Sequence, residues 1–263
     1  MNKTNLFRIL MCFFIFGTFG VSNLSLAQNV VFETQADVDS FNPNTEVING
    51  DLSIGLDEYN INDIVDLSNL ENLTRVTGDL NIESTSLENL DDLSNLEDIG
   101  MQILINRNSL LTNINGLLGF SSSLVNLRIG FNPELLNIDG LSGVSAVANQ
   151  LSFIENNKLM NINGLSNMNS IGAELFLVGN GSLINVDSLV NLESLGSLSV
   201  SSNASLENLS GLSSISQLYY LSISHNNNLA TLDGIQNIEL IENALLIRFN
   251  GSLMDCCAVQ NLL

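Results

Sequence analysis

The sequence predicts a mainly β solenoid of about nine rungs of 23–24 residues, with a capping helix at its N-terminal end. The main observation is a repeated outline: an apolar–any–apolar triplet, an Asn five residues after the first apolar residue, and a Leu three residues after that Asn. A repeat with a period in the twenties indicates stacked structural units. The composition, 45% hydrophobic and 13% charged, excludes a disordered chain. The clearest copies of the outline begin at Leu127, Leu151, Leu175, Leu198 and Leu221.

Each rung is expected to begin with a short strand, in which the two apolar residues of the triplet point inward and the middle residue points outward. Successive strand starts are separated by 28, 23, 24, 24, 24, 23, 23 and 24 residues. The first interval is longer because it contains an insertion around Asp57-Glu58-Tyr59. The predicted first strand residues are Leu52, Leu80, Ile103, Leu127, Leu151, Leu175, Leu198, Leu221 and Leu245.

The first 27 residues have the features of a secretory signal peptide. Lys3 and Arg8 precede an apolar run from Ile9 to Phe19, and Ser25-Leu26-Ala27 forms a small-residue cleavage site. The apolar run is too short for a transmembrane helix, so we expect no membrane insertion. The predicted location is therefore secreted or cell-surface.

Residues 28–51 are predicted to form an N-terminal cap, and residues 52–263 the solenoid. Thr34 is the expected N-cap of a short helix, with Asp37 in its first turn. Phe41 and Asn42-Pro43 end the helix, because the residue before a proline avoids the helical conformation. Such a helix would cover the first exposed rung of a solenoid.

One column of the repeat consists of asparagines, preceded in the first two rungs by Asp57 and Thr85. Stacked asparagine side chains can satisfy backbone groups at a turn that neither a helix nor a sheet satisfies. We therefore expect a buried, structural ladder. Its asparagines are Asn108, Asn132, Asn156, Asn180, Asn203, Asn226 and Asn250.

A glycine column is expected to mark a repeated tight corner at which φ is positive. Its members are Gly116, Gly140, Gly164, Gly211 and Gly234.

The sequence predicts no C-terminal cap of the solenoid within residues 52–263. Cys256 and Cys257 are adjacent, and two neighbouring cysteines fit ordinary disulfide geometry poorly. Their partners are expected elsewhere. A small apolar group, Leu246 and Phe249 next to Arg248, is expected to pack under such a cap.

The charge balance restricts the partners. The chain has 28 Asp and Glu against 7 Lys and Arg, a formal charge of −21. Removal of residues 1–27 takes away two bases and no acids, which leaves 5 − 28 = −23. A protein of this charge is not expected to bind nucleic acid, because phosphate recognition needs a basic surface.

No arrangement of residues indicates catalysis, a cofactor or a metal ion. His225 is the only histidine, and we interpret it as a solvated strand residue. The spacing of an EF-hand is missing around Asp139-Gly140 and Asp233-Gly234, and no phosphate-binding, zinc-protease or nucleophile-elbow motif occurs. The sequence predicts no catalytic residue and no enzyme.

The outward strand positions are mostly serine, with an apolar exception in the middle rungs. Phe131, Ile154, Phe176 and Val178 lie there, with Arg128 and Glu155 beside them. An apolar patch with a charged rim is typical of an interaction site. Alternatively, a loop or a further segment covers these residues, or the inward and outward register differs at Phe131.

The chain resembles the receptor L-domain branch of leucine-rich-repeat-like solenoids. The resemblance rests on Gly50-Asp51-Leu52-Ser53-Ile54, on Gly78-Asp79-Leu80-Asn81-Ile82, on the Asn-x-x-Leu turns and on the Asn-Ile-Asn/Asp-Gly-Leu corners. The segment TQADVDSFNPNTEVINGDLSIG and the late Asp255-Cys256-Cys257 also look like secreted repeat proteins of the Bacteroidetes. The similarity spans about residues 33–263 and implies a right-handed solenoid. One difference is that Leu follows the Asn by three residues, whereas an ordinary leucine-rich repeat has two.

Two functions follow as hypotheses. The first is a secreted or cell-surface, non-catalytic recognition module whose strand face binds a protein or a glycan. The alternative is a structural surface or adhesin spacer protein without a single ligand site. A hydrolase that acts through Asp or Glu has no supporting constellation. The repeat determines neither the ligand nor the oligomeric state, because the fold hosts many functions.

Overall fold

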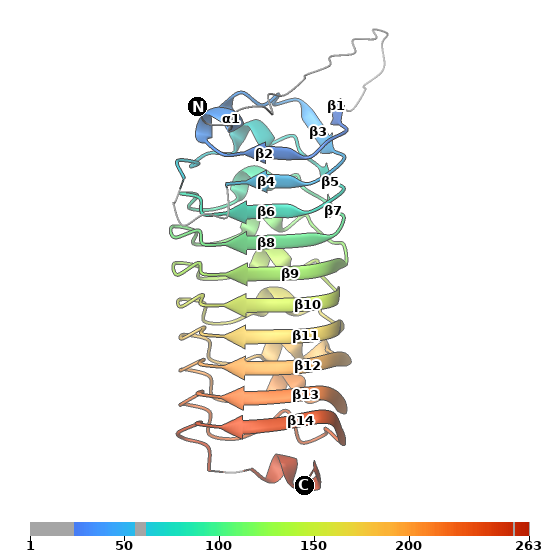
Figure 1. The fold of residues 1–263 in the computed structure, drawn as a ribbon, viewed down its shortest axis with the longest axis vertical. Helices are drawn as coiled ribbons and strands as arrows, with labels where there is room; N and C mark the ends of the chain where they lie inside the picture. Colours follow the sequence, from blue (N-terminus) through green and yellow to red (C-terminus); the bar gives the residue numbers. More distant parts are fainter. Residues whose placement is uncertain (1–23, 56–61, 255, 263) are drawn as a thin grey trace, which may run out of the picture.

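The computed structural model describes residues 24–55, 62–254 and 256–262, and these form one coil of stacked rungs (Figure 1). Its main feature is a parallel ten-stranded sheet in which each strand pairs with the strand of the next rung. Nine of its strands contain the predicted strand starts, and β2 lies in the segment predicted as the cap. The strands are β2 (Val30–Phe32), β4 (Leu52–Ile54), β6 (Leu80–Glu83), β8 (Gln102–Asn106), β9 (Leu124–Gly130), β10 (Ala146–Ile154), β11 (Ser170–Val178), β12 (Ser194–Ser201), β13 (Gln217–Ser224) and β14 (Leu240–Arg248).

A smaller parallel sheet of four short strands lies at the N-terminal end. Its strands are β1 (Leu24–Leu26), β3 (Thr45–Ile48), β5 (Arg75–Val76) and β7 (Asp98–Ile99). β1 lies inside the segment predicted as the signal peptide. It pairs with β3, and the Leu26 side chain packs against the core.

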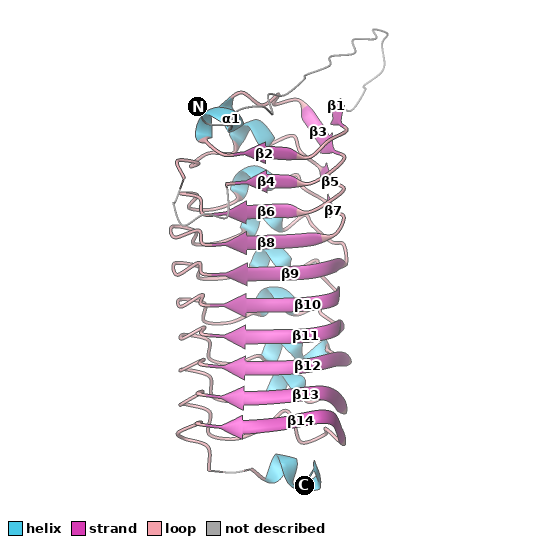
Figure 2. Ribbon diagram, viewed as in Figure 1, coloured by secondary structure: helices cyan, strands magenta, loops and turns pink. Residues whose placement is uncertain are grey.

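The wall of the coil behind the long sheet consists of short 3₁₀ helices, stacked one per rung (Figure 2). A similar helix ends the described chain. They are η1 (Ser68–Leu70), η2 (Asp91–Leu93), η3 (Asn115–Leu117), η4 (Asp139–Leu141), η5 (Asn163–Leu165), η6 (Asp187–Asn191), η7 (Ser210–Leu212) and η8 (Cys257–Leu262).

The helix α1 (Gln35–Asp39) follows the N-cap Thr34, as the sequence predicts. Thr34 and Asp37 form a capping box, in which the Thr34 N–H donates to the Asp37 carboxylate at 2.8 Å. Phe41 follows the helix and packs edge-to-face against Phe32, with ring centroids 5.2 Å apart. α1 lies beside β2 at the end of the coil (Figure 1).

The core is a continuous apolar stack inside the coil. Leu127, Leu151 and Leu175 are paired across β9, β10 and β11, and all three are fully buried. Each rung therefore shields the apolar side chains of its neighbours from water. A rung on its own would leave these side chains exposed.

The asparagines of the repeat form a hydrogen-bonded ladder at the turn that follows each strand of the long sheet. Asn156 is representative: its Oδ1 accepts from the backbone N–H and the Nδ2 of Asn132, both at 3.2 Å. Its own Nδ2 donates to the Ile129 carbonyl at 3.0 Å and to Asn180 Oδ1 at 3.3 Å. Each asparagine thus satisfies backbone groups of the preceding rung and contacts the next asparagine.

The ladder begins at Thr85, whose N–H and hydroxyl both donate to Asn108 Oδ1, at 3.0 and 2.7 Å. It runs to Asn250, whose Oδ1 accepts from the Asn226 N–H at 2.9 Å. Asp57, the predicted first member, lies outside the described residues. From Asn108 to Asn226 the ladder asparagines are fully buried, so their hydrogen bonds are shielded from water.

The glycine column has a different cause from the one predicted. Only Gly234 in this column has a positive φ, of 107°. At the other glycines of the column, the backbone of the preceding rung leaves no room for a side chain. A Cβ on Gly116 would lie 1.6 Å from the Leu90 carbonyl oxygen, and a Cβ on Gly140 would lie 1.9 Å from the Ile114 carbonyl oxygen. These glycines allow close stacking of the 3₁₀ helices, whereas the expected left-handed corner is absent from them.

A polar series also links the starts of the first strands. Asn29 Oδ1 accepts from the Asp51 N–H, and Asp51 Oδ1 accepts from the Asp79 N–H, both at 2.9 Å. Burial raises the pKa of the Asp79 carboxyl above its ordinary value of 3.8, and the nearby charge of Asp51 raises this pKa further. A hydrogen bond from the Gln102 backbone opposes the shift. Ionised Asp79 is therefore less favourable in the folded chain than in the unfolded chain.

Asp79→Asn is expected to make the protein more stable than the parent at pH 7. The folded parent binds its proton more tightly than the unfolded chain, so the cost of the ionised carboxyl disappears as the pH falls through the folded pKa. The gain should therefore shrink as the pH falls through the folded pKa and vanish below about pH 3.8, the ordinary value of the unfolded chain. Urea unfolding of both proteins from pH 3.5 to 7 measures this difference, and a variant less stable than the parent at pH 7 would contradict the prediction.

Candidate interaction surface

The outward side chains of the long sheet form columns that run along the coil. We call these outward positions, from β8 to β14, the strand face. The strand register fixes two neighbouring columns near the ends of the strands. The middle column contains Leu104, Arg128, Ser152, Phe176, Ser199, Ser222 and Leu246. The outer column contains Asn106, Gly130, Ile154, Val178, Ser201, Ser224 and Arg248.

Three of the predicted patch residues are adjacent on this face. Ile154 and Val178 are direct cross-strand partners, and Phe176 lies beside Val178 on β11. All three are half-buried, as are the equivalent residues Ser199, Ser201 and Ser222 of later rungs, but these three are apolar where the later rungs have serine. Such cross-strand neighbours are within contact distance. β10 and β11 therefore present a small apolar patch.

Arg128 lies at the edge of this patch. It is separated from Phe176 in the middle column by Ser152, which is only 4% exposed. Arg128 itself is exposed. The structure thus places a cation on one side of a covered serine and an aromatic ring on the other.

Phe131 does not occupy the outward strand position that the sequence analysis assigns to it. It follows the last residue of β9 and has a φ of 55°, in the left-handed region. Its N–H donates to the Ile154 carbonyl at 2.7 Å, and its side chain is 46% exposed. The Arg107 guanidinium lies 5.6 Å from its ring centroid, within cation–π distance. Phe131 therefore lies on a turn beside the strand face.

The same turn geometry recurs before each ladder residue from Thr85 onward. We call this column the turn ridge. Left-handed φ costs a residue with a side chain roughly 1–2 kcal/mol, and glycine avoids this cost. In the turn ridge only Gly179 avoids this cost. The backbones of the other ridge residues are held in an unfavourable conformation along one edge of the strand face. The ridge residues are Ser84, Arg107, Phe131, Glu155, Gly179, Ser202, His225 and Phe249.

His225 is likewise a turn-ridge residue, although the sequence indicated a strand position. It is exposed, with φ of 59°, and its ring centroid lies 4.9 Å from that of Phe249. Phe249 is 66% exposed and also contacts Arg248, whose guanidinium is 5.7 Å from the ring centroid. These two aromatic residues form a second, smaller group at the C-terminal end of the ridge. Leu246, predicted to pack with them under a cap, is half-buried on the strand face.

Cys256 and Cys257 are exposed at the start of η8. Asp255, which belongs to the same predicted segment, lies outside the described residues.

Two residues of this surface do not stand out in the sequence. Leu104 occupies the middle column next to Arg128, but its place between Ile103 and Ile105 makes the stretch look like a buried strand. Arg107 stands immediately before Asn108, as Phe131 stands before Asn132. That shared position is the only sequence signal that joins it to Phe131.

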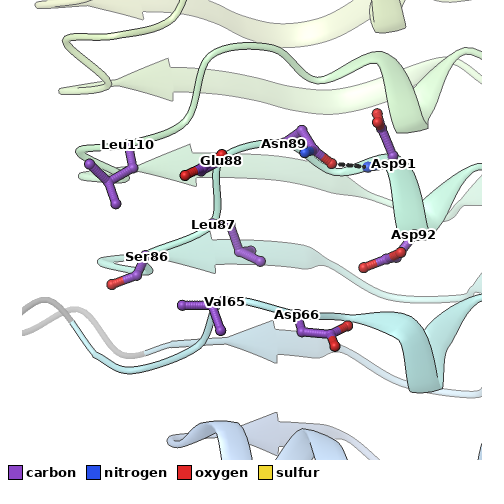
Figure 3. Close-up of a pocket in the computed structure, with 9 residues that line it drawn as sticks. All are labelled: Val65, Asp66, Ser86, Leu87, Glu88, Asn89, Asp91, Asp92 and Leu110. Carbon is purple, nitrogen blue, oxygen red and sulfur yellow. Dashed lines mark hydrogen bonds between the residues drawn. The ribbon is translucent and has the colours of Figure 1, made fainter.

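A groove of about 580 Å³ lies away from the strand face, between the turns and the 3₁₀ helices of the second to fourth rungs (Figure 3). Its walls carry the carboxylates of Asp66, Glu88, Asp91 and Asp92. Two of these are hydrogen-bonded to the backbone: Asp66 accepts from the Ser68 N–H at 2.7 Å, and Asp92 from the Leu67 N–H at 3.0 Å. Among the described residues, no group of three or more His, Cys, Asp or Glu is placed to hold a metal ion. The groove has the polar contacts of a folded turn and no recognisable reactive pair.

Comparison with known proteins gives one family match. The family described as Receptor L domain matches residues 44–160. A comparison with curated protein sequences finds no significant relative. In the described part of the chain, no helix has the length and apolar character that crossing a membrane requires.

The solved structures that match this chain include the following two. An internalin of Listeria monocytogenes is 14% identical, with a TM-score of 0.36, over 87% of this chain and 86% of that one. A leucine-rich-repeat protein of Leptospira interrogans is 13% identical, with a TM-score of 0.23, over 82% of this chain and 88% of that one.

Proposed function

We propose that this chain, which has a receptor L-domain-like, leucine-rich-repeat-like fold, is a non-catalytic recognition module that binds a protein or a glycan through its strand face. The fold is typical of protein-interaction modules. The proposal includes export, because residues 1–27 have the features of a signal peptide. The partner is not a nucleic acid, since the formal charge is −21.

The observation that carries the proposal is the apolar patch of Ile154, Phe176 and Val178, with Arg128 at its edge. The later strands show what the same positions look like without a patch: Ser199 and Ser222 in the middle column, and Ser201 in the outer column. Serine satisfies a solvated sheet face and leaves no apolar surface exposed. Apolar side chains at equivalent positions on a rigid scaffold therefore favour a binding role.

A charge substitution at the centre of the patch is expected to abolish binding. Phe176→Asp removes the aromatic ring and introduces a charge that binding would have to desolvate, so a partner held by the parent should be lost. The measurement is a pull-down from envelope and host-surface extracts with the purified protein, followed by the affinity of each captured component.

Ser222→Asp is the matched control, because it adds the same charge in the same column, two strands away. It should retain the partner. Circular dichroism checks that both variants fold. If the Phe176→Asp variant binds every captured component as tightly as the parent, the strand face is not the binding site.

A structural spacer or adhesin is the second candidate, and the edge of the long sheet favours it. Within the described residues β14 pairs only with β13, and none of its nine residues is buried. Open sheet edges promote association between chains. Self-association in light scattering, unaffected by Phe176→Asp, would favour this role, and a strictly monomeric protein would count against it.

A further inference from the structure

Arg128 is an isolated cation in a strongly acidic protein. Its cross-strand partners are Leu104 and Ser152, and the residues two positions away on its own strand are Asn126 and Gly130. None of these is acidic. Within the described parts of the chain, the guanidinium has no hydrogen bond and no ion pair.

Two other cations of the chain are neutralised by neighbours. Arg75 pairs with Asp98 at 2.9 Å, and Lys158 pairs with Glu134. Acids outnumber bases by 28 to 7, so an acidic neighbour is the common situation for a base in this sequence. Arg128 departs from it beside the apolar side chains of β10 and β11. Arg248, at the C-terminal end of the strand face, also has no ion pair among the described residues, but its guanidinium lies 5.7 Å from the Phe249 ring centroid. The Arg128 guanidinium is thus available for an anion from outside the chain.

The spacing between the cation and the patch limits what can bind both. Arg128 and Phe176 are two strands apart, which corresponds to ~10 Å. An extended polypeptide rises ~3.3 Å per residue, so two or three residues cover this distance. Ser152 between them is covered, so a ligand would lie over it.

We propose, on the basis of the recognition function above, that the patch binds a segment of a partner protein that presents a carboxylate and, two or three residues away, an apolar side chain. The carboxylate is held by the Arg128 guanidinium, whose planar fork can make two parallel hydrogen bonds to it. The apolar side chain packs on Ile154, Phe176 and Val178. Arginine beside aromatic and aliphatic anchors is a common composition of protein-binding hot spots.

A protein segment fits these side chains better than a glycan does. Two of the three patch residues, Ile154 and Val178, are branched aliphatic side chains that offer no flat face for stacking on a sugar ring. A neutral glycan would also leave the charge of Arg128 unused.

The test is selection from a displayed random peptide library against the folded parent protein. Peptides retained by the parent should be enriched about tenfold in Asp or Glu at one position, two or three residues from an apolar residue. With Arg128→Gln the acidic preference should disappear while the apolar preference remains. Arg75→Gln is the control and should select the same peptides as the parent, because Arg75 lies in the smaller sheet.

Two results would overturn the inference alone. These are binders without acidic enrichment, or acidic enrichment that persists with Arg128→Gln. If such peptides still require Phe176 for binding, the proposed recognition function is retained and only the proposed preference for a carboxylate is wrong. If the parent selects no peptide that the Phe176→Asp variant does not, the segment proposal fails, and binding of the parent to a glycan array would then identify the glycan alternative.

Discussion

Replacement of Asn156 by leucine is expected to destabilise the protein by about 2–6 kcal/mol. Asn156 is fully buried, and its side chain is the hydrogen-bond partner of the Asn132 N–H and the Ile129 carbonyl. Leucine has nearly the same shape but neither donor nor acceptor. Two backbone groups would be left buried without a partner, at about 1–3 kcal/mol each. Denaturant unfolding followed by circular dichroism measures the loss.

Asn157 provides the control for this prediction. It is the next residue in the chain, it is exposed, and Asn157→Leu should change the free energy of unfolding by less than about 0.5 kcal/mol. Asn156→Thr should fall between the two, because Thr85 shows that a threonine hydroxyl can donate to the next ladder residue. If Asn156→Leu and Asn157→Leu have equal effects, the ladder contributes no net stability.

Gly116→Ala is expected to destabilise the protein by about 3 kcal/mol. The added Cβ would lie 1.6 Å from the Leu90 carbonyl oxygen, which belongs to the backbone of the preceding rung and cannot rotate away. The two rungs must therefore separate, and the apolar contacts between them loosen. Thermal unfolding measures the effect as a lower midpoint.

Gly119 is the matched control, because it lies in the same rung and is exposed. A Cβ on Gly119 would have its nearest neighbours at 3.5 Å, an ordinary contact. Gly119→Ala should leave the stability unchanged or raise it by about 0.4–1 kcal/mol, since alanine restricts the unfolded chain. Equal midpoints for the two alanine variants would show that close stacking of the 3₁₀ helices is not required.

One rung shows how the fold accommodates a side chain in the glycine column. Ser188 occupies this position in η6, and its hydroxyl donates to the Ile162 carbonyl at 2.9 Å. η6 is also longer than the other helices of this wall, with five residues. A hydroxyl can thus replace close packing where the rung adjusts. Alanine at Gly116 brings no hydroxyl and therefore no such compensation.

The fold could be predicted from the sequence because the repeat specifies it redundantly. The apolar triplet, the Asn and the following Leu recur together, so an error in one rung is corrected by its neighbours. The column of Leu127, Leu151 and Leu175 in the core illustrates this agreement. Local signals at single positions are weaker. A glycine required by a positive φ and one required by a close backbone look identical in a sequence, which explains the wrong expectation at Gly116 and Gly140.

The candidate surface could be predicted only in part for the same reason. Alternation along β10 and β11 correctly indicates that Ile154, Phe176 and Val178 face outward. It fails at Phe131, because alternation carries no information about where the strand ends and the left-handed turn begins. Leu104 could not be recognised as an outward residue, because both of its neighbours in the sequence, Ile103 and Ile105, are also apolar. Whether a charge such as Arg128 lacks an oppositely charged neighbour depends on its cross-strand partners. These partners follow only from the strand register, which the sequence alone does not give.

The uniform ladder also has an evolutionary consequence. Asn132, Asn156 and Asn180 are 24 residues apart and make the same bonds to one another. A duplication or deletion of one such unit would join an identical donor to an identical acceptor. The coil could therefore lengthen or shorten and still form every hydrogen bond of the ladder. A single-residue insertion or deletion must fall outside the ladder turn, as in the 23-residue step from Asn180 to Asn203, which keeps the same bond. Descendants of such a gene should therefore differ in length by whole units, and their binding faces should grow or shrink one row at a time.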